Sequence, residues 1–424
     1  MIHPMAPLTE TAPSDILIAS RRSRKLAGKR VAMVTYSSYP EDPRPRRAID
    51  ALVGEGMKVD LICLGAGEGG NQKQKGSVGG VNVLRIPIKH RRGGKITYIY
   101  QYGSFIFLST LIFALRTFQQ RYDLVYVHNM PDILVISALI PKLLGARVVL
   151  DLHDPMPELM TTIFGLDKKS ANVRLIRRME KWSIARANLV VTVNLACKKI
   201  FSARSCNAEK IAVVMNAPDP KIFPFRPAVE STKVETRGDR PFVFMYHGSM
   251  VQRNGLDLAV EALGLVHRKM PNCQLRVFGR STPFLERVME TVRAKGLQNT
   301  VQFLGSRRQE DLVSEIEGCD VGVIPNQRNL FTDINTPTRI FEYLAVGKSV
   351  IAPSTSGIQD YFNNESLIFF EAGNAEDLAD KMVFAYSQHE KLADIARSGQ
   401  EIYQMHTWEQ ERTTLLDRVS GILN

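Results

Sequence analysis

The run LVYVH at residues 124–128 is a short apolar segment that ends in a histidine. Similar runs stand at 147–152 (RVVLDL) and 189–193 (LVVTV), with segments of helical spacing between them. Short apolar runs of this kind are typical of parallel strands covered by helices on both faces. Further runs lie at 29–34, 58–64, 81–86 and 210–214. The alternation therefore predicts an α/β, doubly wound, Rossmann-like domain over residues 28–216.

The same alternation restarts after a proline-rich stretch without periodicity, residues 217–240, which predicts a linker. Apolar runs then recur at 242–246, 274–278, 301–304, 321–324, 349–352 and 367–370. They predict a second Rossmann-like domain over 241–400, followed by an amphipathic C-terminal helix over 401–424. Residues 1–27 are expected to form a mobile extension. Two such domains predict a cleft bounded by the carboxyl ends of their strands.

The charge of the chain is unevenly distributed. Residues 1–220 carry 32 Lys and Arg against 17 Asp and Glu, a net of +15, whereas the chain as a whole carries +12. A basic half suits an anionic membrane, a phosphorylated substrate or nucleic acid. No nucleic-acid-binding motif accompanies it, so nucleic acid is not expected as a partner. The five cysteines form no C-x-x-C pair, which favours a reducing, cytoplasmic compartment.

Residues 96–118 (ITYIYQYGSFIFLSTLIFALRTF) form an apolar segment with basic residues on either side. Three interpretations stay open: a helix packed on the domain, a helix lying at an anionic membrane surface, or a membrane span. Ser and Gln side chains interrupt the segment, which favours the packed helix over the span. The membrane-surface interpretation predicts a cytoplasmic protein that is peripheral on the inner face of the plasma membrane.

Residues 335–348 (NTPTRIFEYLAVGK) carry the strongest chemical signal. Pro337 sets the start of a helix, with Thr336 and Thr338 beside it as capping residues. A helix N-terminus offers unpaired N–H groups to a diphosphate. Glu342, one turn later, can accept hydrogen bonds from a ribose diol. The alternative is an ordinary capped helix that carries a surface glutamate.

This segment resembles the nucleotide-binding signature of retaining GT-B glycosyltransferases of the group 1, or family 4, class, of the type that builds surface polysaccharides. The similarity covers nearly the whole chain. It is carried, in order, by Tyr39–Arg47 (YPEDPRPRR), His128–Asp132 (HNMPD), Leu150–Glu158 (LDLHDPMPE), Glu180–Trp182 (EKW), Val191–Asn194 (VTVN), Val214–Pro218 (VMNAP), Tyr246–Ser249 (YHGS) and Asn254–Leu258 (NGLDL).

The resemblance implies a role for each matching residue. His153 is expected beside the donor sugar, bonding a hydroxyl or the phosphate, and Arg253 is expected to give charge to the leaving diphosphate; with Glu342 they form the predicted catalytic set. Predicted donor-binding residues are Gly248, Ser249, Asp333, Thr336, Pro337, Thr338 and Arg339. Predicted acceptor-side residues are Asp42, Arg44, Asp154 and Glu158. Glu158 can instead be a helix-start residue, and Arg253 a solvated surface residue.

Three positions depart from the family pattern. The family commonly has Arg and Lys where this chain has Ser249 and Asn254, and a glutamate where it has Ile334. Arg253, Arg307, Arg308 or Arg339 can supply the missing charge, and Asp333 can take over contacts to the sugar.

The implied reaction is retaining transfer of a hexose from a UDP- or GDP-linked donor to a lipid-linked or polysaccharide acceptor. Charge grows on the departing phosphate, so fixed donors aimed there lower the barrier. No D-x-D motif stands in a suitable loop, so no metal and no other cofactor is expected. The alternatives are a nucleotide-sugar epimerase or phosphorylase of the same fold, and a non-catalytic scaffold.

Overall fold

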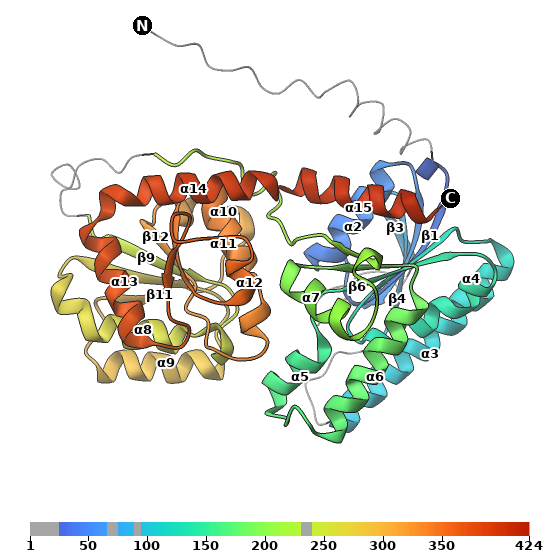
Figure 1. Cartoon of the computed structure of the whole chain (residues 1–424), viewed down its shortest axis with the longest axis horizontal. Helices are drawn as coiled ribbons and strands as arrows, with labels where there is room; N and C mark the ends of the chain where they lie inside the picture. Colours follow the sequence, from blue (N-terminus) through green and yellow to red (C-terminus); the bar gives the residue numbers. More distant parts are fainter. Residues whose placement is uncertain (1–24, 66–74, 89–94, 230–239, 424) are drawn as a thin grey trace, which may run out of the picture.

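The computed structural model describes residues 25–65, 75–88, 95–229 and 240–423. It contains two parallel sheets in two domains that lie side by side (Figure 1). The predicted fold class, two Rossmann-like domains of the GT-B type, is confirmed. Residues 1–24 of the expected extension lie outside the described residues. Leu26, which we assigned to that extension, is fully buried in the N-terminal core, so the domain begins before residue 28.

The N-terminal sheet has eight strands in the order β3-β4-β2-β1-β5-β6-β7-β8. The strands are β1 (Arg30–Ser38), β2 (Lys58–Leu64), β3 (Lys75–Val78), β4 (Val81–Ile86), β5 (Leu124–His128), β6 (Arg147–Leu152), β7 (Leu189–Thr192) and β8 (Ile211–Val213). All pairs are parallel except β3 with β4. Strand β3 lies between the apolar runs 58–64 and 81–86 and was not expected from the sequence. Its four residues are all exposed, so β3 has no apolar run by which it can be recognised.

Helices cover both faces of the N-terminal sheet. They are α2 (Pro43–Gly54), α3 (Lys95–Gln119), η1 (Asp132–Ala138), α4 (Leu139–Leu143), α5 (Met156–Phe164), α6 (Ala171–Arg186), α7 (Leu195–Arg204) and η2 (Ala208–Lys210). The apolar segment 96–118 is helix α3, which packs against η1 and α4. Within the described part of the chain, no helix combines the length and the apolar character needed to cross a bilayer.

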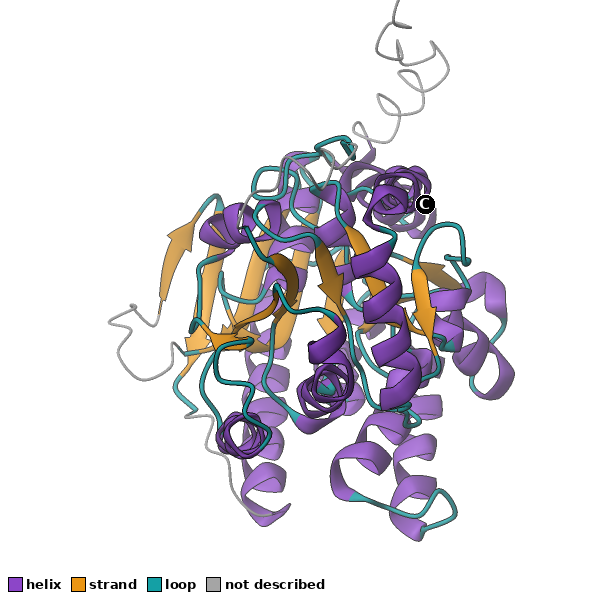
Figure 2. Ribbon diagram, turned by 90° about the vertical axis from the view of Figure 1, so that its left-hand side faces the viewer, coloured by secondary structure: helices purple, strands orange, loops and turns teal. Residues whose placement is uncertain are grey.

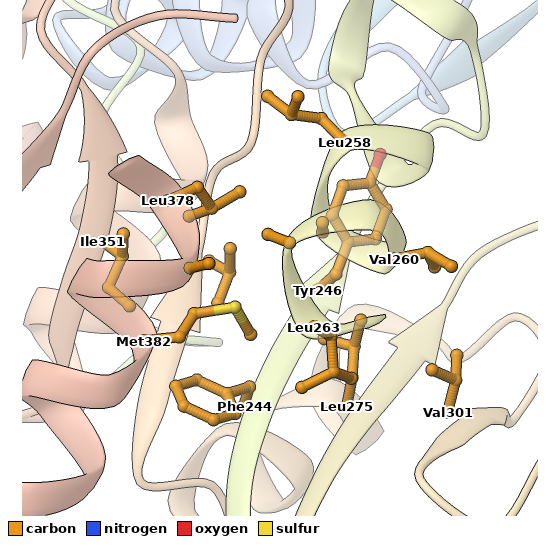
Figure 3. Packing of buried hydrophobic residues seen from close by; sticks show 14 of the residues in the cluster. Phe244, Tyr246, Leu258, Val260, Leu263, Leu275, Val301, Ile351, Leu378 and Met382 are labelled. Carbon is orange, nitrogen blue, oxygen red and sulfur yellow. The ribbon is translucent and has the colours of Figure 1, made fainter. Parts of the chain in front are cut away.

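The C-terminal sheet has six parallel strands in the order β11-β10-β9-β12-β13-β14. They are β9 (Phe242–His247), β10 (Cys273–Phe278), β11 (Val301–Phe303), β12 (Val321–Val323), β13 (Ser349–Pro353) and β14 (Ile368–Phe370). β9 is buried along its whole length because it lies in the middle of the sheet. Figure 3 shows how its alternate residues Phe244 and Tyr246 pack with Leu263 and Met382 from the covering helices.

The helices of this domain surround the sheet, as Figure 2 shows for the molecule as a whole. They are η4 (Gln252–Asn254), α8 (Leu256–Val266), η5 (His267–Lys269), α9 (Pro283–Ala294), α10 (Gln309–Glu317), η6 (Thr332–Ile334), α11 (Thr338–Ala345), α12 (Ser356–Gln359), α13 (Ala375–Ser387) and η7 (His389–Lys391). The last two helices, α14 (Leu392–Met405) and α15 (Trp408–Ile422), run along one side of both domains (Figure 1).

The chain crosses between the domains twice. In the first crossing, Ala217 and Phe223 are buried, so this part of the predicted linker is packed; residues 230–239 lie outside the described residues. In the second, α14 packs on α11 of the C-terminal domain and α15 packs on α2 of the N-terminal domain. Trp408, at the start of α15, packs against the N-terminal core.

Both sheets reverse direction of winding at their central strand. In the N-terminal sheet the switch lies between β1 and β5, and in the C-terminal sheet it lies between β9 and β12. The loops at the carboxyl ends of strands diverge at such a point and leave a crevice in which α/β proteins bind ligands. The functional site is therefore expected where these two crevices face each other.

Candidate active site in the interdomain cleft

Two adjoining cavities occupy the cleft between the domains. The larger, which we call the donor chamber after the substrate that the sequence analysis expects there, has a volume of about 790 Å³ and is lined almost wholly by the C-terminal domain. The smaller, the acceptor chamber, has a volume of about 330 Å³ and is lined mainly by the N-terminal domain. Phe223, Gln309 and Glu342 line both. The larger volume lies within the range of small-molecule sites, and the shared residues make the chambers parts of one site.

The donor chamber is strongly cationic. Four arginines line it, and Glu342 is the acidic residue among its lining. The four are Arg253, Arg280, Arg307 and Arg339. Each comes from a different segment near the carboxyl end of the sheet, so the charges converge only in the folded chain. Arginines in this arrangement suit a diphosphate, which accepts charge-assisted hydrogen bonds on several oxygens.

Arg339 is held in place by its neighbours. Its Nη1 donates to the carbonyl oxygen of His247 at 2.8 Å and its Nη2 to Asn326 Oδ1 at 3.2 Å. The guanidinium lies 5.0 Å from the ring centroid of Tyr246. This side chain is therefore fixed before any ligand binds.

Gly248, a predicted donor-binding residue, lines the donor chamber, but its own N–H is already bonded. Its N–H donates to the carbonyl oxygen of Phe278 at 3.0 Å and so is not available to a phosphate. Its φ is +123°, and a Cβ at this position would lie 3.3 Å from the side chain of Arg339. Glycine is needed here because the backbone passes close beneath that arginine. Ser249 follows in the lining of the same chamber.

The loop that carries Arg253 is closed by its own residues. Asn254 Nδ2 donates to the carbonyl oxygen of Ser249 at 2.9 Å, so Asn254, where the family commonly has lysine, holds the loop shape. Gly255 has a φ of +70°, and a Cβ there would lie 1.6 Å from the carbonyl oxygen of Pro325. Only glycine allows this approach, which places Arg253 in the lining of the donor chamber.

Glu342 lies where the two chambers meet. It stands on α11 with its side chain 13% exposed, and its Oε2 is 3.5 Å from Nε2 of His247. Burial raises the pKa of the Glu342 carboxyl to about 7, although the charges of Arg339 and Arg47 oppose this. Burial, together with the charge of Arg339, lowers the pKa of His247 to about 3. The histidine is therefore neutral, and a carboxyl that titrates near neutrality faces the cleft.

The remaining donor-binding residues predicted around α11 have different positions in the structure. Pro337 is the N-cap of the helix, and Thr338 lines the acceptor chamber. Thr336 joins the domains instead: its Oγ1 accepts from Asn194 Nδ2 at 3.0 Å and donates to the carbonyl oxygen of Gly357 at 2.6 Å. Asp333 is not among the residues that line either chamber. Its carbonyl oxygen accepts from the hydroxyl of Ser356.

A buried network lies behind the acceptor chamber. Arg44 Nη2 and Nε contact Asp151 Oδ1 at 2.6 and 3.0 Å, and the hydroxyl of Tyr126 donates to Oδ2 at 3.0 Å. Arg44 also donates to Asn216 Oδ1 at 2.8 Å. Burial tends to raise the pKa of Asp151, but the charge of Arg44 holds it far below its usual range. Arg44, predicted to contact acceptor, is thus engaged mainly within the protein.

His153 lines the acceptor chamber beside this network. Its backbone N–H donates to Asn129 Oδ1 at 2.7 Å, and its Nε2 lies 3.0 Å from Nδ1 of His128. Burial holds the pKa of His153 well below its usual value. A neutral imidazole is suited to bond a sugar hydroxyl or a phosphate oxygen, as predicted, and carries no charge of its own.

His128, Asp151 and His153 are also the described residues whose ligand atoms lie close enough to hold a metal ion. However, Asp151 Oδ1 is already occupied by the guanidinium of Arg44 at 2.6 Å. The two imidazoles face each other at hydrogen-bond distance. The three side chains are therefore bonded to one another and to Arg44.

The other acceptor-side predictions have mixed outcomes. Asp42 and Asp154 line the acceptor chamber; Asp42 also caps α2 by accepting from the N–H of Arg44. Burial raises the pKa of Asp154 to about 6, against the charge of Arg253 across the cleft. Glu158 is not brought to the chamber: its two oxygens bind the guanidinium of Arg204 at 2.6 and 2.9 Å. Its position at the start of α5 matches the helix-start alternative.

The sequence analysis missed several residues of the site. Arg46 and Arg47 line the acceptor chamber, and Arg280 lines the donor chamber. Arg47 donates to the carbonyl oxygen of Ala217 and lies 5.5 Å from the ring of Trp408, so it touches the hinge and the crossing helix together. Arg280 follows the carboxyl end of β10, a place at which the strand-end rule points. Arg308, named as a source of charge, instead pairs with Asp311 on the surface.

Both domains match known domain families. Residues 28–217 match the family described as "Glycosyl transferase 4-like domain", and residues 229–402 match "Glycosyl transferases group 1". Among curated proteins, the chain is 21% identical over 248 residues to the probable glycosyltransferase WbjE of Pseudomonas aeruginosa. That alignment covers 57% of this chain and 59% of WbjE.

Solved structures share the fold over nearly the full length. Sucrose-phosphate synthase of Thermosynechococcus elongatus superposes with a TM-score of 0.73 at 16% identity, covering 93% of this chain and 99% of that one. HepE of Anabaena, in complex with UDP, superposes with a TM-score of 0.68 at 16% identity, covering 93% and 100%. The same protein was also solved with UDP-glucose, with a TM-score of 0.67 at 17% identity and coverage of 92% and 99%. At these identities the similarity shows the GT-B fold.

Proposed function

With a glycosyl transferase 4-like domain followed by a group 1 glycosyl transferase domain, the chain is a GT-B glycosyltransferase, and we propose that it moves a hexose, with retention, from a nucleoside-diphosphate sugar to a lipid-linked or polysaccharide acceptor. In this proposal the donor occupies the larger chamber and the acceptor the smaller one. The observation that carries it is the convergence of four arginines around the donor chamber. The complexes of HepE with UDP and UDP-glucose support the choice of donor class.

The proposed reaction breaks the bond between the anomeric carbon and the β-phosphate oxygen. The acceptor hydroxyl oxygen forms the new bond on the same face of the sugar, and its proton passes to an oxygen of the departing diphosphate. Negative charge grows on that diphosphate, so the fixed guanidinium of Arg339 and the charges of Arg253 and Arg280 stabilise the transition state. We propose that these arginines neutralise the charge on the departing diphosphate, which a bound metal ion does in other enzymes.

Glu342 and His153 orient the donor in this scheme. Ionised Glu342 accepts hydrogen bonds from the ribose diol of the nucleotide, while neutral His153 bonds a sugar hydroxyl or a phosphate oxygen. Both residues line the acceptor chamber, one from each domain. The sugar is therefore proposed to sit where the domains meet.

A donor panel tests the proposal. Purified protein is incubated with UDP- and GDP-linked hexoses, and release of the nucleoside diphosphate is measured with and without a saccharide or lipid-linked acceptor. We expect release with at least one donor, and losses of about 100-fold in Glu342→Ala and His153→Ala, the range found on removing one fixed transition-state contact. Glu261→Ala, an exposed change on α8, is the matched control and should retain full activity.

Several outcomes would contradict the proposal. Release that both substitutions leave unchanged would remove the site assignment. A donor that is converted to its epimer without loss of the nucleotide would favour the epimerase alternative. Binding of a nucleotide sugar without any turnover across the panel would favour the scaffold. The configuration of the product, read by NMR, decides between retention and inversion.

A further inference from the structure

Helix α3 exposes an apolar stripe along most of its length. Its exposed side chains are Tyr100, Phe107, Leu108, Leu111, Leu115 and Phe118. Tyr100, Phe107 and Phe118 are 74%, 68% and 75% exposed, although side chains of this kind are usually buried. At about 100° per residue the six fall within one sector of the helix, so they form one continuous strip. The opposite side of the same helix supplies buried Phe105 and Phe113 to the core.

Helix α6 presents a basic surface on the same side of the domain. Its exposed charged residues are Arg174, Arg177, Arg178 and Lys181. Both α3 and α6 pack against η1, and in Figure 1 both run along the lower right of the molecule. Both helices therefore cover the same face of the sheet, and their outer sides point away from it.

Acidic residues are scarce on this surface: Asp167, in the loop between α5 and α6, is exposed, but it stands beside exposed Lys168 and Lys169. Helix α3 contains no Asp or Glu, and the one acidic residue of α6, Glu180, is fully buried and paired with Arg204. At the end of α5 and in the first turns of α6, the exposed apolar residues Ile163, Phe164 and Leu175 extend the apolar character of the surface. An apolar strip beside side chains that are predominantly basic matches the interface of an anionic bilayer.

We propose that the exposed stripe of α3 and the basic side of α6 together dock this protein on a bilayer that contains anionic lipid. The aromatic and leucine side chains of α3 enter the boundary between headgroups and acyl chains, while the arginines of α6 bind the lipid phosphates. The helix lies in the plane of the surface, because its other side is held in the core. Docking of this kind does not depend on the proposed reaction.

Vesicle flotation tests the docking surface. The full chain is mixed with vesicles of phosphatidylcholine alone or of phosphatidylcholine with phosphatidylglycerol, at low and at high salt. We expect flotation with the anionic vesicles at low salt, and a partition coefficient at least about tenfold lower at high salt, since the headgroup attraction is screened.

Two variants separate the apolar and the basic contributions. Phe107→Ser with Leu111→Ser and Phe118→Ser removes the stripe, and Arg174→Gln with Arg177→Gln and Arg178→Gln removes the charges. Each should lower partitioning by about tenfold or more, because each basic residue near the surface and each buried apolar side chain contributes to binding. Leu265→Ser with Arg287→Gln, exposed on the C-terminal domain, is the matched control and should float like the wild type.

Circular dichroism and release of nucleotide from the donor verify that each variant is folded. The proposal is overturned if the wild type stays in the soluble fraction with both kinds of vesicle, or if the variants float as well as the control. Light scattering measures the oligomeric state. If the wild type is a dimer and the stripe variant is a monomer, the surface binds a second copy of the chain and the membrane proposal is wrong.

Discussion

The two chambers of the cleft use their arginines in opposite ways. In the acceptor chamber, Arg44 is bound to Asp151 and Asn216, and Arg47 to the carbonyl oxygen of Ala217. In the donor chamber, Arg253 and Arg280 form no side-chain hydrogen bond to another described residue, and Arg339 donates only to neutral oxygens. Arg307 is the exception among the four, because it pairs with Glu315 at 3.4 Å and donates to the carbonyl oxygen of Leu304 at 2.7 Å. Charges that are paired inside the protein hold the chain together, whereas charges left unpaired beside a cavity remain available to an anionic ligand.

This difference shows why the count of basic residues misleads. The N-terminal domain supplies most of the net charge of the chain, yet its cavity-lining arginines serve mainly as internal ties. The C-terminal domain has slightly more acidic than basic residues but gathers four arginines around one cavity. Local geometry, and not the charge of the domain, decides where a diphosphate is expected to bind.

The largest expected effect is on the paired arginine. Arg44→Ala leaves the carboxylate of Asp151 buried without its cation, and breaking a buried pair in this way costs about 3–5 kcal/mol of unfolding free energy. Urea denaturation measures the loss. Arg280→Ala, at a cavity-lining arginine without a partner among the described residues, should change the unfolding free energy by less than about 0.5 kcal/mol. Equal losses of unfolding free energy in the two variants would contradict the contrast between paired and unpaired arginines.

The unpaired arginines should show the reverse behaviour in activity. Arg253→Ala and Arg280→Ala each remove a charged donor to the diphosphate, worth about 1.5–3 kcal/mol, so kcat/KM should fall by about 10- to 100-fold. Arg253→Lys should retain part of the activity, because it keeps the charge. Arg287→Ala, on the outer side of α9, is the control. If these variants instead lose thermal stability in the absence of nucleotide and keep the kcat/KM of the wild type, the assignment of Arg253 and Arg280 to the diphosphate is wrong.

Glu342→Gln sharpens the comparison through its pH dependence. The folded pKa of Glu342, about 7, lies above the ordinary value of 4.5, so the folded protein binds the proton more tightly than the unfolded chain. Wild-type stability contributed by this group is therefore present below pH 4.5 and is lost as the pH rises to 7. At pH 8 the variant should be more stable by on the order of 3 kcal/mol, at about 1.4 kcal/mol per pKa unit.

Thermal denaturation of wild type and variant across pH 4 to 8 measures this difference. The two curves should converge at low pH, where the wild-type carboxyl is protonated in both states. Donor affinity should move the other way and weaken in the wild type below about pH 7, as the carboxylate that we propose to bind the ribose is protonated. A constant offset between the curves at every pH would show that the substitution acts through packing.

The smallest expected effect is that of chelation. Because four arginines already surround the donor chamber, EDTA should change the rate of nucleotide release by less than about twofold. Inductively coupled plasma analysis of the same sample gives the metal content. Loss of all activity on chelation, restored by a divalent cation, would contradict a reaction that depends on arginine alone and would direct attention to His128 and His153.

Much of this protein was determined by local sequence. Apolar runs of strand length with helical segments between them specified two α/β domains, because a strand buried on both faces must be apolar along its whole length. Pro337 marked the start of α11, and the spacing from there placed Glu342 on its first turns. Strand β3 was not recognisable, because all four of its residues are exposed and it is defined by its pairing with β4.

Tertiary structure alone decided which polar residues meet. Arg44 on α2 and Asp151 on β6 are more than a hundred residues apart and become a buried pair only in the folded domain. Arg253, Arg280, Arg307 and Arg339 lie in four separate segments, and no local pattern shows that they share one cavity. Glu158 carries the same chemistry as Glu342, yet it is bound by Arg204. The sequence determines which side chains carry a charge. Which groups they pair with depends on distances that are fixed only when the chain has folded.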